Sequence, residues 1–330
     1  MIIDIYNPYT NQDVTVDYVS IIVSALKLLG HQPVYCDKIS KNKKEKGIIV
    51  IAELDAIKAR LKGYKKIILW QQGVWGEESY MRNNSKIRFF ITSWLEKKAI
   101  KLSDMVFMVS DEMRLHYLKK YKFEPRNYFI MPCFNEEFDK NQFMKHNYSK
   151  NVFIYAGGLS KWQCFEKTMD LYKNIENKYG EKVELRILTK DIETAKNIIE
   201  NKGICNYSID FVPKEKVREE MKYAKFGFCI REDNPVNNVA TPTKLSSYVC
   251  NGVIPIYSAA IRDFSKVAKS SNYVLNIDSP DYIDRLDNLI TNEIKTEALY
   301  DDYSKTFGNY YSKTKYINQI LLILKKVLDE

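Results

Sequence analysis

Cysteine and histidine are scarce in this sequence, and their spacing does not match a metal site. The 330 residues include six cysteines and three histidines, with no C-x-x-C pair. Scattered cysteines are typical of reduced thiols, so we expect neither a disulfide framework nor a zinc site. No two aspartates lie two positions apart, which excludes the Asp-x-Asp motif. The sequence therefore predicts no bound metal and no cofactor.

Long hydrophobic runs are missing as well. No stretch of about 18 apolar residues occurs, so no helix is predicted to span a membrane. The first residues, MIIDIYNPYT, have no basic n-region and no long hydrophobic segment, which argues against a signal peptide. Twelve glycines and nine prolines are too few for a collagen or low-complexity chain. We expect a cytoplasmic protein, with peripheral binding to the inner face of the membrane left open.

Acidic residues are under-represented in the first half of the chain only. Residues 1–150 contain 25 basic and 17 acidic side chains, whereas residues 151–330 contain 26 and 25, so most of the net charge of +9 lies in the first half. A basic half is typical of a protein with an anionic partner, such as nucleic acid, anionic lipid or a phosphate-bearing acceptor. A solvated, lysine-rich surface is an equally good interpretation.

Short apolar runs alternate with amphipathic stretches along the chain, which predicts an α/β fold with mostly parallel sheets and helices on both faces. A length of 330 residues corresponds to about two domains. The polar segment 135–150 is the best linker candidate, so we predict domains over residues 1–148 and 149–330. Packing of the last helix on the first domain is left open as an alternative.

The segment from Tyr155 to Gln163 (YAGGLSKWQ) is the first candidate for a phosphate site. A strand ends there, two glycines follow, and a helix begins soon after. Glycines let backbone N–H groups approach a phosphate, and a helix N-terminus favours its charge. The pattern is neither G-x-G-x-x-G nor a P-loop, and strand–Gly–Gly–helix turns are common.

The segment from Phe228 to Tyr248 is the more specific candidate. A buried strand leads through a polar loop to a helix that is predicted to begin with Thr241 as N-cap and Pro242 at the first position. Arg231 follows the strand, at the edge where doubly wound sheets bind ligands. The helix start, with Thr243 and Lys244, is suited to a diphosphate. The alternative is an ordinary helix start in which Arg231 pairs with an acid.

These two segments resemble the donor-binding strand–loop–helix units of GT-B-fold glycosyltransferases, and the second half is similar to glycosyltransferase family 4. The segment WQQGVWGEES, ending at Ser79, resembles the acceptor-side loop of relatives that build bacterial surface polysaccharides. The resemblance implies two Rossmann-like, doubly wound domains facing each other across a cleft. It departs from the family at Val239 and Ser247, where two glutamates are usual, and at Gly158, where an arginine is usual.

The residues and the resemblance together assign roles to three sets of side chains. The catalytic candidates are Arg231, Lys244 and Glu78. The donor-binding candidates are Gly157, Gly158, Lys161, Thr189, Val212, Asn237, Thr241, Pro242, Thr243 and Ser247. The acceptor-side candidates are Gln72, Gly73 and Glu77, although Glu77 and Glu78 also fit an exposed pair at a helix start.

The implied reaction is transfer of a sugar from a nucleotide diphosphate sugar to a hydroxyl of a saccharide or lipid-linked acceptor, in bacterial surface polysaccharide synthesis. The resemblance implies a retaining, metal-independent enzyme. Without a metal, fixed cations and a helix N-terminus must stabilise the diphosphate leaving group. The alternatives are a nucleotide-sugar epimerase, a non-catalytic nucleotide-sugar-binding subunit, and a module that binds nucleic acid or an anionic surface; nucleic acid is the partner that we least expect.

The stretch 86–101 (KIRFFITSWLEKKAIK) mixes aromatic and basic residues. Ile87, Phe90, Ile91, Trp94 and Leu95 share one face of the predicted helix. A basic amphipathic helix of this kind can lie on an anionic membrane surface. Such a face more often packs in the core of a domain.

Overall fold

The computed structural model describes residues 1–7, 13–41 and 46–329. Their contacts divide the chain into two compact units. Unit 1 comprises residues 1–133, 238–241 and 312–330, and unit 2 comprises residues 134–237 and 242–311. Each unit contains one six-stranded parallel sheet, which confirms the predicted α/β class with two Rossmann-like units.

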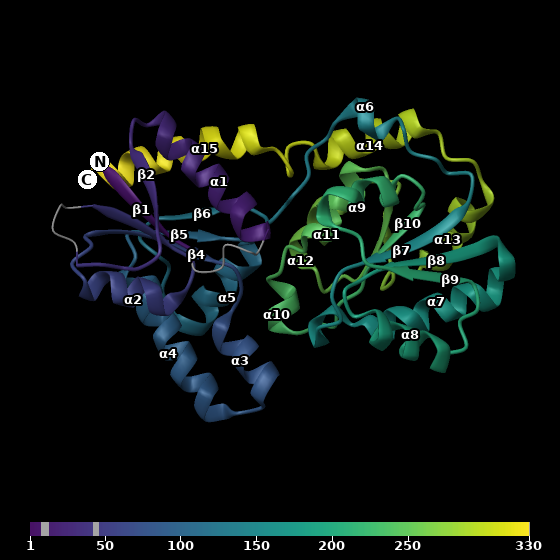
Figure 1. The fold of residues 1–330 in the computed structure, drawn as a ribbon, viewed down its shortest axis with the longest axis horizontal. Helices are drawn as coiled ribbons and strands as arrows, with labels where there is room; N and C mark the ends of the chain where they lie inside the picture. Colours follow the sequence, from purple (N-terminus) through teal and green to yellow (C-terminus); the bar gives the residue numbers. More distant parts are fainter. Residues whose placement is uncertain (8–12, 42–45, 330) are drawn as a thin grey trace. The chain divides into compact units, whose positions relative to one another are not determined.

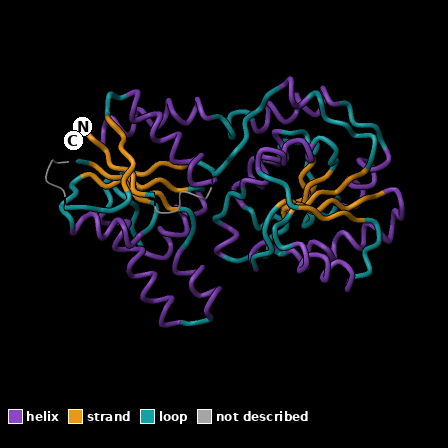
Figure 2. The backbone as a smooth tube through the Cα atoms, in the orientation of Figure 1, coloured by secondary structure: helices purple, strands orange, loops and turns teal. Residues whose placement is uncertain are grey.

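The sheet of unit 1 has the strand order β2-β1-β3-β4-β5-β6. Figure 2 shows the strands in orange, with purple helices on both sides. Its central strands are apolar on both faces, as expected for a parallel sheet covered by helices on both sides. All residues of β3 and β5 are buried. Figure 1 shows α1 and α15 on one face of this sheet and α2 on the other. The strands are β1 (Ile2–Tyr6), β2 (Gln32–Cys36), β3 (Gly47–Val50), β4 (Lys66–Gln71), β5 (Met105–Met108) and β6 (Tyr128–Ile130). The helices are α1 (Asp13–Leu28), α2 (Glu53–Leu61), α3 (Trp75–Asn83), α4 (Lys86–Leu102), α5 (Asp111–Tyr121) and α15 (Lys313–Asp329).

The sheet of unit 2 has the order β12-β11-β10-β7-β8-β9. Aromatic side chains fill its core, and the rings of Phe153 and Phe226 stack with centroids 4.6 Å apart. The strands are β7 (Asn151–Ala156), β8 (Val183–Leu188), β9 (Tyr207–Asp210), β10 (Phe226–Cys229), β11 (Ile254–Tyr257) and β12 (Leu275–Asn276). The helices are α6 (Lys140–Phe143), α7 (Phe165–Tyr179), α8 (Ile192–Asn201), α9 (Lys214–Met221), α10 (Pro235–Asn238), α11 (Thr243–Cys250), α12 (Arg262–Ala268), α13 (Tyr282–Thr291) and α14 (Thr296–Phe307), with two short 3-10 turns, η1 (Lys161–Gln163) and η2 (Gly180–Lys182).

Residues 134–148 pack with unit 2, so the contacts change units earlier than the predicted boundary after residue 148. The reason is a set of hydrogen bonds to α11 and the turn after it. The hydroxyls of Ser246 and Ser247 donate to Asn135 Oδ1, and Tyr148 donates to the carbonyl of Gly252 at 2.7 Å. The final helix, α15, packs against α1 of unit 1.

Among the described residues, no helix is both long and apolar enough to cross a bilayer.

Candidate functional site

Arg231 is held at the carboxyl end of the unit 2 sheet, two residues after β10. It is 4% exposed, and its backbone N–H donates to Ser258 Oγ at 2.8 Å. Its guanidinium donates to the Ile230 carbonyl at 3.0 Å and to Gln163 Oε1 at 2.7 Å. These partners are neutral, so the positive charge of Arg231 is oriented but not compensated by a carboxylate.

Lys244 lies in the first turn of α11 and shares the surroundings of Arg231. Its Nζ is enclosed, 4.2 Å from the centre of the Tyr155 ring, and has no hydrogen-bond partner among the described residues. Burial, and then the charge of Arg231, lower the pKa of Lys244 from 10.5 to about 7. The phosphate-loop glycine is also close, because a Cβ added at Gly157 would lie 3.2 Å from the Lys244 Nζ. Gly157 has a φ of +146°, which favours glycine in any case.

Two buried cations side by side without an acidic partner destabilise a protein unless an anion completes the site. In the described part of the chain, neither Arg231 nor Lys244 forms an ion pair with Asp or Glu. The alternative in which Arg231 pairs with an acid is therefore wrong for the free protein. The arrangement suits a ligand with at least two negative charges, bound beside a glycine backbone at the carboxyl end of the sheet.

The other residues of the glycine loop lie further out. Gly158 is exposed, its carbonyl accepts a hydrogen bond from the Tyr155 hydroxyl at 2.7 Å, and a Cβ there would meet no atom within 4 Å. Lys161 is exposed in η1. Beyond β8, Thr189 is 3% exposed, and its Oγ1 accepts from the Asp191 N–H at 3.2 Å. Val212, beyond β9, is partly exposed.

The start of α11 differs from the prediction. The helix begins at Thr243, with Pro242 as the N-cap residue, whereas Thr241 was expected to cap it. Thr241 instead belongs to unit 1, where its Oγ1 accepts a hydrogen bond from the Cys133 N–H at 2.9 Å. Thr243 is partly exposed in the first turn. Asn237 closes the preceding loop, because its Nδ2 donates to the Glu232 carbonyl at 3.0 Å.

Val239 and Ser247, the positions at which the family has glutamates, both have structural contacts. The Val239 carbonyl accepts a hydrogen bond from Ser110 Oγ at 2.6 Å within unit 1. Ser247 Oγ donates to Asn135 Oδ1 at 3.0 Å in unit 2. Neither side chain offers a carboxylate.

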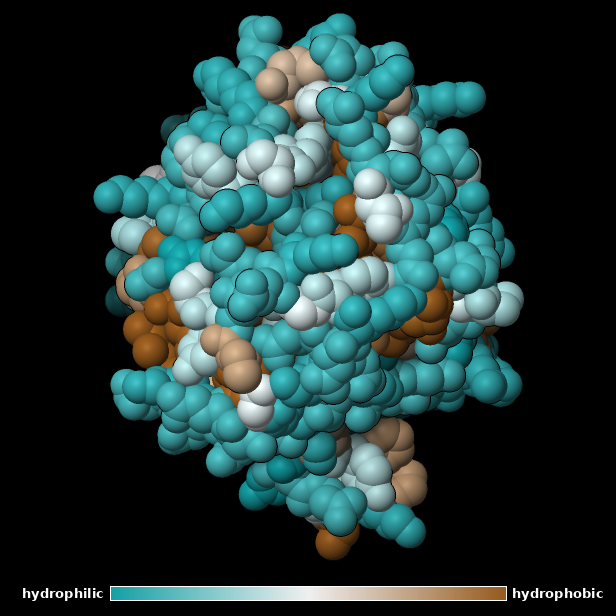
Figure 3. Space-filling model, turned by 90° about the vertical axis from the view of Figure 1, so that its right-hand side faces the viewer, coloured by the Kyte–Doolittle hydropathy of each residue, from teal (hydrophilic) through white to brown (hydrophobic). Residues whose placement is uncertain are grey.

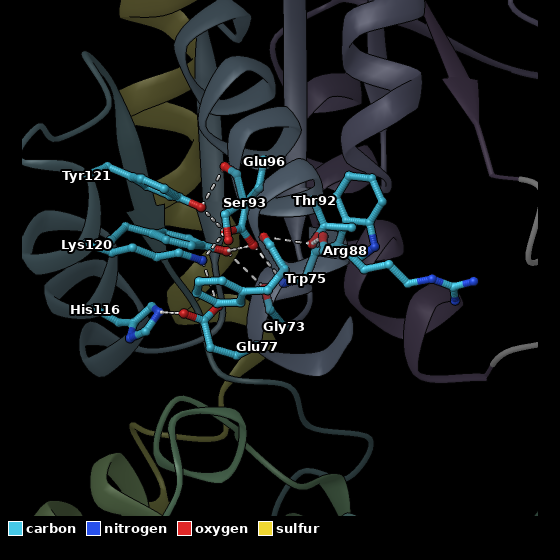
Figure 4. Close-up of polar contacts among 12 residues, drawn as sticks. Gly73, Trp75, Glu77, Arg88, Thr92, Ser93, Glu96, His116, Lys120 and Tyr121 are labelled. Atoms are coloured by element: carbon cyan, nitrogen blue, oxygen red, sulfur yellow. Dashed lines mark hydrogen bonds and ion pairs between the residues drawn. The ribbon is translucent and has the colours of Figure 1, made fainter. Parts of the chain in front are cut away.

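The acceptor-side glutamates of unit 1, Glu77 and Glu78, are both partly buried and so are not an exposed pair. Figure 4 shows the contacts of Glu77. The Glu77 carboxylate lies 2.9 Å from His116 Nε2 and 2.8 Å from Lys120 Nζ. Burial would raise the pKa of Glu77, but the hydrogen bonds from His116 and Lys120 lower it below its usual range. Lys120 also reaches Glu96, at 3.1 Å. Glu77 is therefore a charged member of a packed cluster that joins α3, α4 and α5.

Glu78 lies beside the predicted loop and pairs with Arg82 at 3.0 Å. A Cβ added at Gly73 would lie 1.9 Å from the Glu78 carboxylate, so only glycine fits there without displacing that side chain. Burial raises the pKa of Glu78, and Arg82 offsets part of the rise. Gln72 Nε2 donates to Thr15 Oγ1 at 3.4 Å. The structure thus brings Gly73 and Glu78 together but leaves Gln72 on a separate contact.

Sequence reasoning missed several side chains of these clusters. Gln163, which orients Arg231, lies 68 positions away in the sequence. Glu96 is fully buried and accepts a hydrogen bond from the Trp75 N–H at 2.6 Å. Glu53, at the start of α2, has a pKa that burial, with Glu96 nearby, raises to about 8. A lone acid inside an amphipathic stretch is the one signal that marked Glu96 in the sequence.

No protein-family model matches the chain, and no curated protein matches it by sequence. Solved structures do match. Sucrose-phosphate synthase from Thermosynechococcus elongatus superposes with a TM-score of 0.72 at 10% identity, over 100% of this chain and 99% of that one. The lipopolysaccharide outer core galactosyltransferase WaaB gives 0.66 at 12% identity, over 99% of both chains. The structure described as trehalose-6-phosphate from E. coli, bound with UDP-2-fluoro glucose, gives 0.64 at 12% identity, over 95% of this chain and 77% of that one.

These likenesses confirm the predicted GT-B fold of glycosyltransferases and, at such identities, the fold alone. The sites described above come from this chain's own side chains. Among the described residues, no group of three or more His, Cys, Asp or Glu is placed to hold a metal ion.

Proposed function

We propose that the protein is a glycosyltransferase that moves a sugar from a nucleotide diphosphate sugar to a hydroxyl. The observation that carries the proposal is the pair of buried cations, Arg231 and Lys244, beside Gly157 in unit 2. Among the described residues, this site encloses two basic side chains and has no carboxylate paired with them, which suits a polyanion. A GT-B fold with such a site at the carboxyl end of its second sheet is best explained by a nucleoside diphosphate group.

The chemistry follows from where charge develops. As the bond between the sugar and the diphosphate breaks, negative charge grows on the leaving phosphate oxygen. Arg231 and Lys244 stabilise that charge without a metal, because they are already oriented and enclosed. The N–H groups of the first turn of α11, at Thr243 and Lys244, add to the same effect. Metal independence and retention of the anomeric configuration are parts of this proposal.

The acceptor is proposed to be a saccharide or a lipid-linked saccharide, used in bacterial surface polysaccharide assembly. A similar fold in a lipopolysaccharide galactosyltransferase supports this assignment. The basic excess of residues 1–150 supports a phosphate-bearing acceptor or an anionic membrane surface as partner. The proposed acceptor-side residues are Gly73 and Glu78, together with Glu77 of the adjacent polar cluster. The protein is proposed to act in the cytoplasm, at the inner face of the membrane.

A thermal-shift titration with UDP, GDP, ADP and their sugar derivatives tests the donor site. We expect saturable stabilisation by one nucleotide series. Lys244→Met and Arg231→Gln each remove a charge-assisted contact of about 1.5–3 kcal/mol, so the affinity is expected to fall about tenfold or more. Lys305→Ala, which removes an exposed cation on α14 of the same unit, is the matched control and is expected to bind like the wild type. Product anomers by NMR, with and without a chelator, test retention and metal independence.

Stabilisation by none of the nucleotides would reject the glycosyltransferase proposal. Unchanged affinity in both variants would reject the site assignment but leave nucleotide binding standing. A second candidate is a non-catalytic nucleotide-sugar-binding subunit, which the non-acidic contacts of Val239 and Ser247 favour. It predicts tight binding of a nucleotide sugar, with no transfer of the sugar to water or to any acceptor and so no release of the nucleoside diphosphate.

A further inference from the structure

Helix α4 carries an apolar stripe on its outer face, where a helix of a globular unit normally carries polar residues. Ile87, Phe90, Ile91 and Trp94 follow a spacing of three and four residues, so they line one face. Their exposed fractions are 74%, 68%, 54% and 60%. The core packing expected for this stripe is therefore wrong for these four residues. Tyr80 of the adjacent α3 is 40% exposed.

The helix itself is firmly anchored by its other face. Ser93, Glu96, Ala99 and Ile100 are buried, and α4 packs against α2 and α3. Glu96 is bound by Lys120 as described above, and Figure 4 shows this polar cluster on the inner side of the helix. The outward direction of the apolar stripe is thus fixed by the packing of unit 1.

Basic side chains surround the stripe. The only acid of α4, Glu96, is buried, so the outer surface of this helix carries no acidic side chain. The Nζ of Lys98 lies 5.1 Å from the centre of the Trp94 ring, and the Nζ of Lys101 lies 5.0 Å from that of Phe123. The aliphatic parts of these two lysine side chains run along aromatic rings, and their charged ends lie at the edge of the apolar stripe. The basic residues of the hairpin 75–102 are Arg82, Lys86, Arg88, Lys97, Lys98 and Lys101.

We propose that the α3–α4 hairpin docks the protein on an anionic lipid bilayer, with the apolar stripe in the boundary between headgroups and acyl chains. The basic side chains would contact lipid phosphates, and Trp94 would lie at the depth that tryptophan favours. In Figure 3 the lowest part of the surface, which belongs to the hairpin, shows hydrophobic side chains beside hydrophilic ones. This proposal rests on the proposed function, because that function places the protein at a membrane. It adds the surface by which the protein would bind the membrane.

The charges favour a bilayer over the other occupants. Lysine is depleted at protein–protein interfaces, whereas the helix that carries this stripe has four lysines. A second copy docked by the same face would bring the two sets of basic side chains against each other. A bilayer with anionic headgroups supplies the opposite charge and an apolar interior at the same surface.

Flotation of the full chain with vesicles tests the proposal. We expect binding at low salt to phosphatidylcholine vesicles that contain phosphatidylglycerol, and at least about tenfold weaker binding for Phe90→Ser/Trp94→Ser and for Lys98→Glu/Lys101→Glu. The matched controls are Leu61→Ser, which removes an 82% exposed leucine of α2, and Lys27→Glu/Lys62→Glu, which reverses two exposed lysines of unit 1. Both controls are expected to float with the vesicles like the wild type. Brominated acyl chains are expected to quench the wild-type fluorescence, and Trp94→Phe to lose that quenching.

The wild type failing to bind these vesicles, or the stripe variants binding like the wild type, would overturn the proposal. Self-association in sedimentation runs that Phe90→Ser/Trp94→Ser abolishes would assign the face to a second copy instead. Nucleotide-induced stabilisation is measured on the same variants and is expected to be unchanged. Loss of vesicle binding with intact nucleotide binding would concern the membrane surface alone. Loss of nucleotide binding with intact vesicle binding would concern the proposed reaction alone.

Discussion

Lys244 is an amine whose enclosure decides how it responds to pH. The groups around its Nζ are Arg231, the thiols of Cys164 and Cys229, and the Tyr155 ring, and none of these groups is a carboxylate. Burial lowers the pKa of Lys244 to about 7, so about half of the free protein carries it uncharged near neutrality. A bound diphosphate favours the charged form, so ligand binding and proton uptake are coupled.

The affinity for a nucleotide sugar is therefore expected to fall as the pH rises. Above the pKa of the free protein, each binding event must take up a proton at Lys244, which weakens binding by up to about tenfold per pH unit. Below pH 6 or so the group is already protonated, and the affinity is expected to level off. Calorimetric titration with UDP-glucose between about pH 6 and 8.5, in buffers of different ionisation enthalpy, measures both effects. Lys244→Met is expected to bind weakly without this dependence, and a flat wild-type profile would contradict the prediction.

The sequence supported the prediction of Lys244, Arg231 and Gly157 because each lies next to an element boundary that the pattern reveals. The end of β10, the start of α11 and the turn after β7 converge at one edge of a parallel sheet. The partners of these residues could not be predicted in the same way. Gln163 and Glu96 act through contacts with other elements, and nothing in their local sequence states which element lies opposite. The roles of the predicted site residues in binding remain proposals.

At the scale of elements, the helix starts show which structural features the local sequence predicts and which it does not. A serine followed by two acidic residues is typical of a helix start, and Ser110 does cap α5, because its Oγ accepts the Met113 N–H at 3.0 Å. The local sequence around Thr241 was equally typical of an N-cap, but its hydroxyl accepts a hydrogen bond from the Cys133 N–H instead. In α2 the buried residues are two alanines, Ala56 and Ala59, so the helix lacks a strong apolar period.

Ser110 is expected to matter more than an ordinary cap. Its hydroxyl accepts the Met113 N–H and also donates to the Val239 carbonyl, so it joins α5 to the segment just before α11. We expect Ser110→Ala to lower the free energy of unfolding by about 1–2 kcal/mol, since it removes a cap and leaves a buried carbonyl unpaired. Ser85 caps α4 at a more exposed site, and Ser85→Ala is expected to cost about 0.5–1 kcal/mol. Equal losses in denaturant unfolding would show that the Val239 contact adds nothing.

At the scale of the whole molecule, the chain leaves unit 1 at residue 133 and returns to it twice. Residues 238–241 and the final segment, 312–330, both belong to unit 1. The final helix, α15, packs on α1, the Lys66 Nζ donates to the Val327 carbonyl at 2.7 Å, and Tyr316 lies edge-on to Phe129. The alternating sequence pattern predicted both sheets. The packing of the last helix on the first domain was given only as an alternative. Nothing within an amphipathic stretch states which of two similar sheets its apolar face will cover.

This connectivity predicts that the two units respond to different perturbations. Leu324 of α15 is fully buried, so Leu324→Ala is expected to destabilise unit 1 by about 2–4 kcal/mol. Leu322, on the same helix, is 77% exposed, and Leu322→Ala is expected to stay within about 0.5 kcal/mol of the wild type. A nucleotide bound at the proposed site would stabilise unit 2, so calorimetry is expected to show one transition that Leu324→Ala lowers and another that the nucleotide raises. A single transition that moves in response to both changes would mean that the two units unfold together, because the chain crossings couple them.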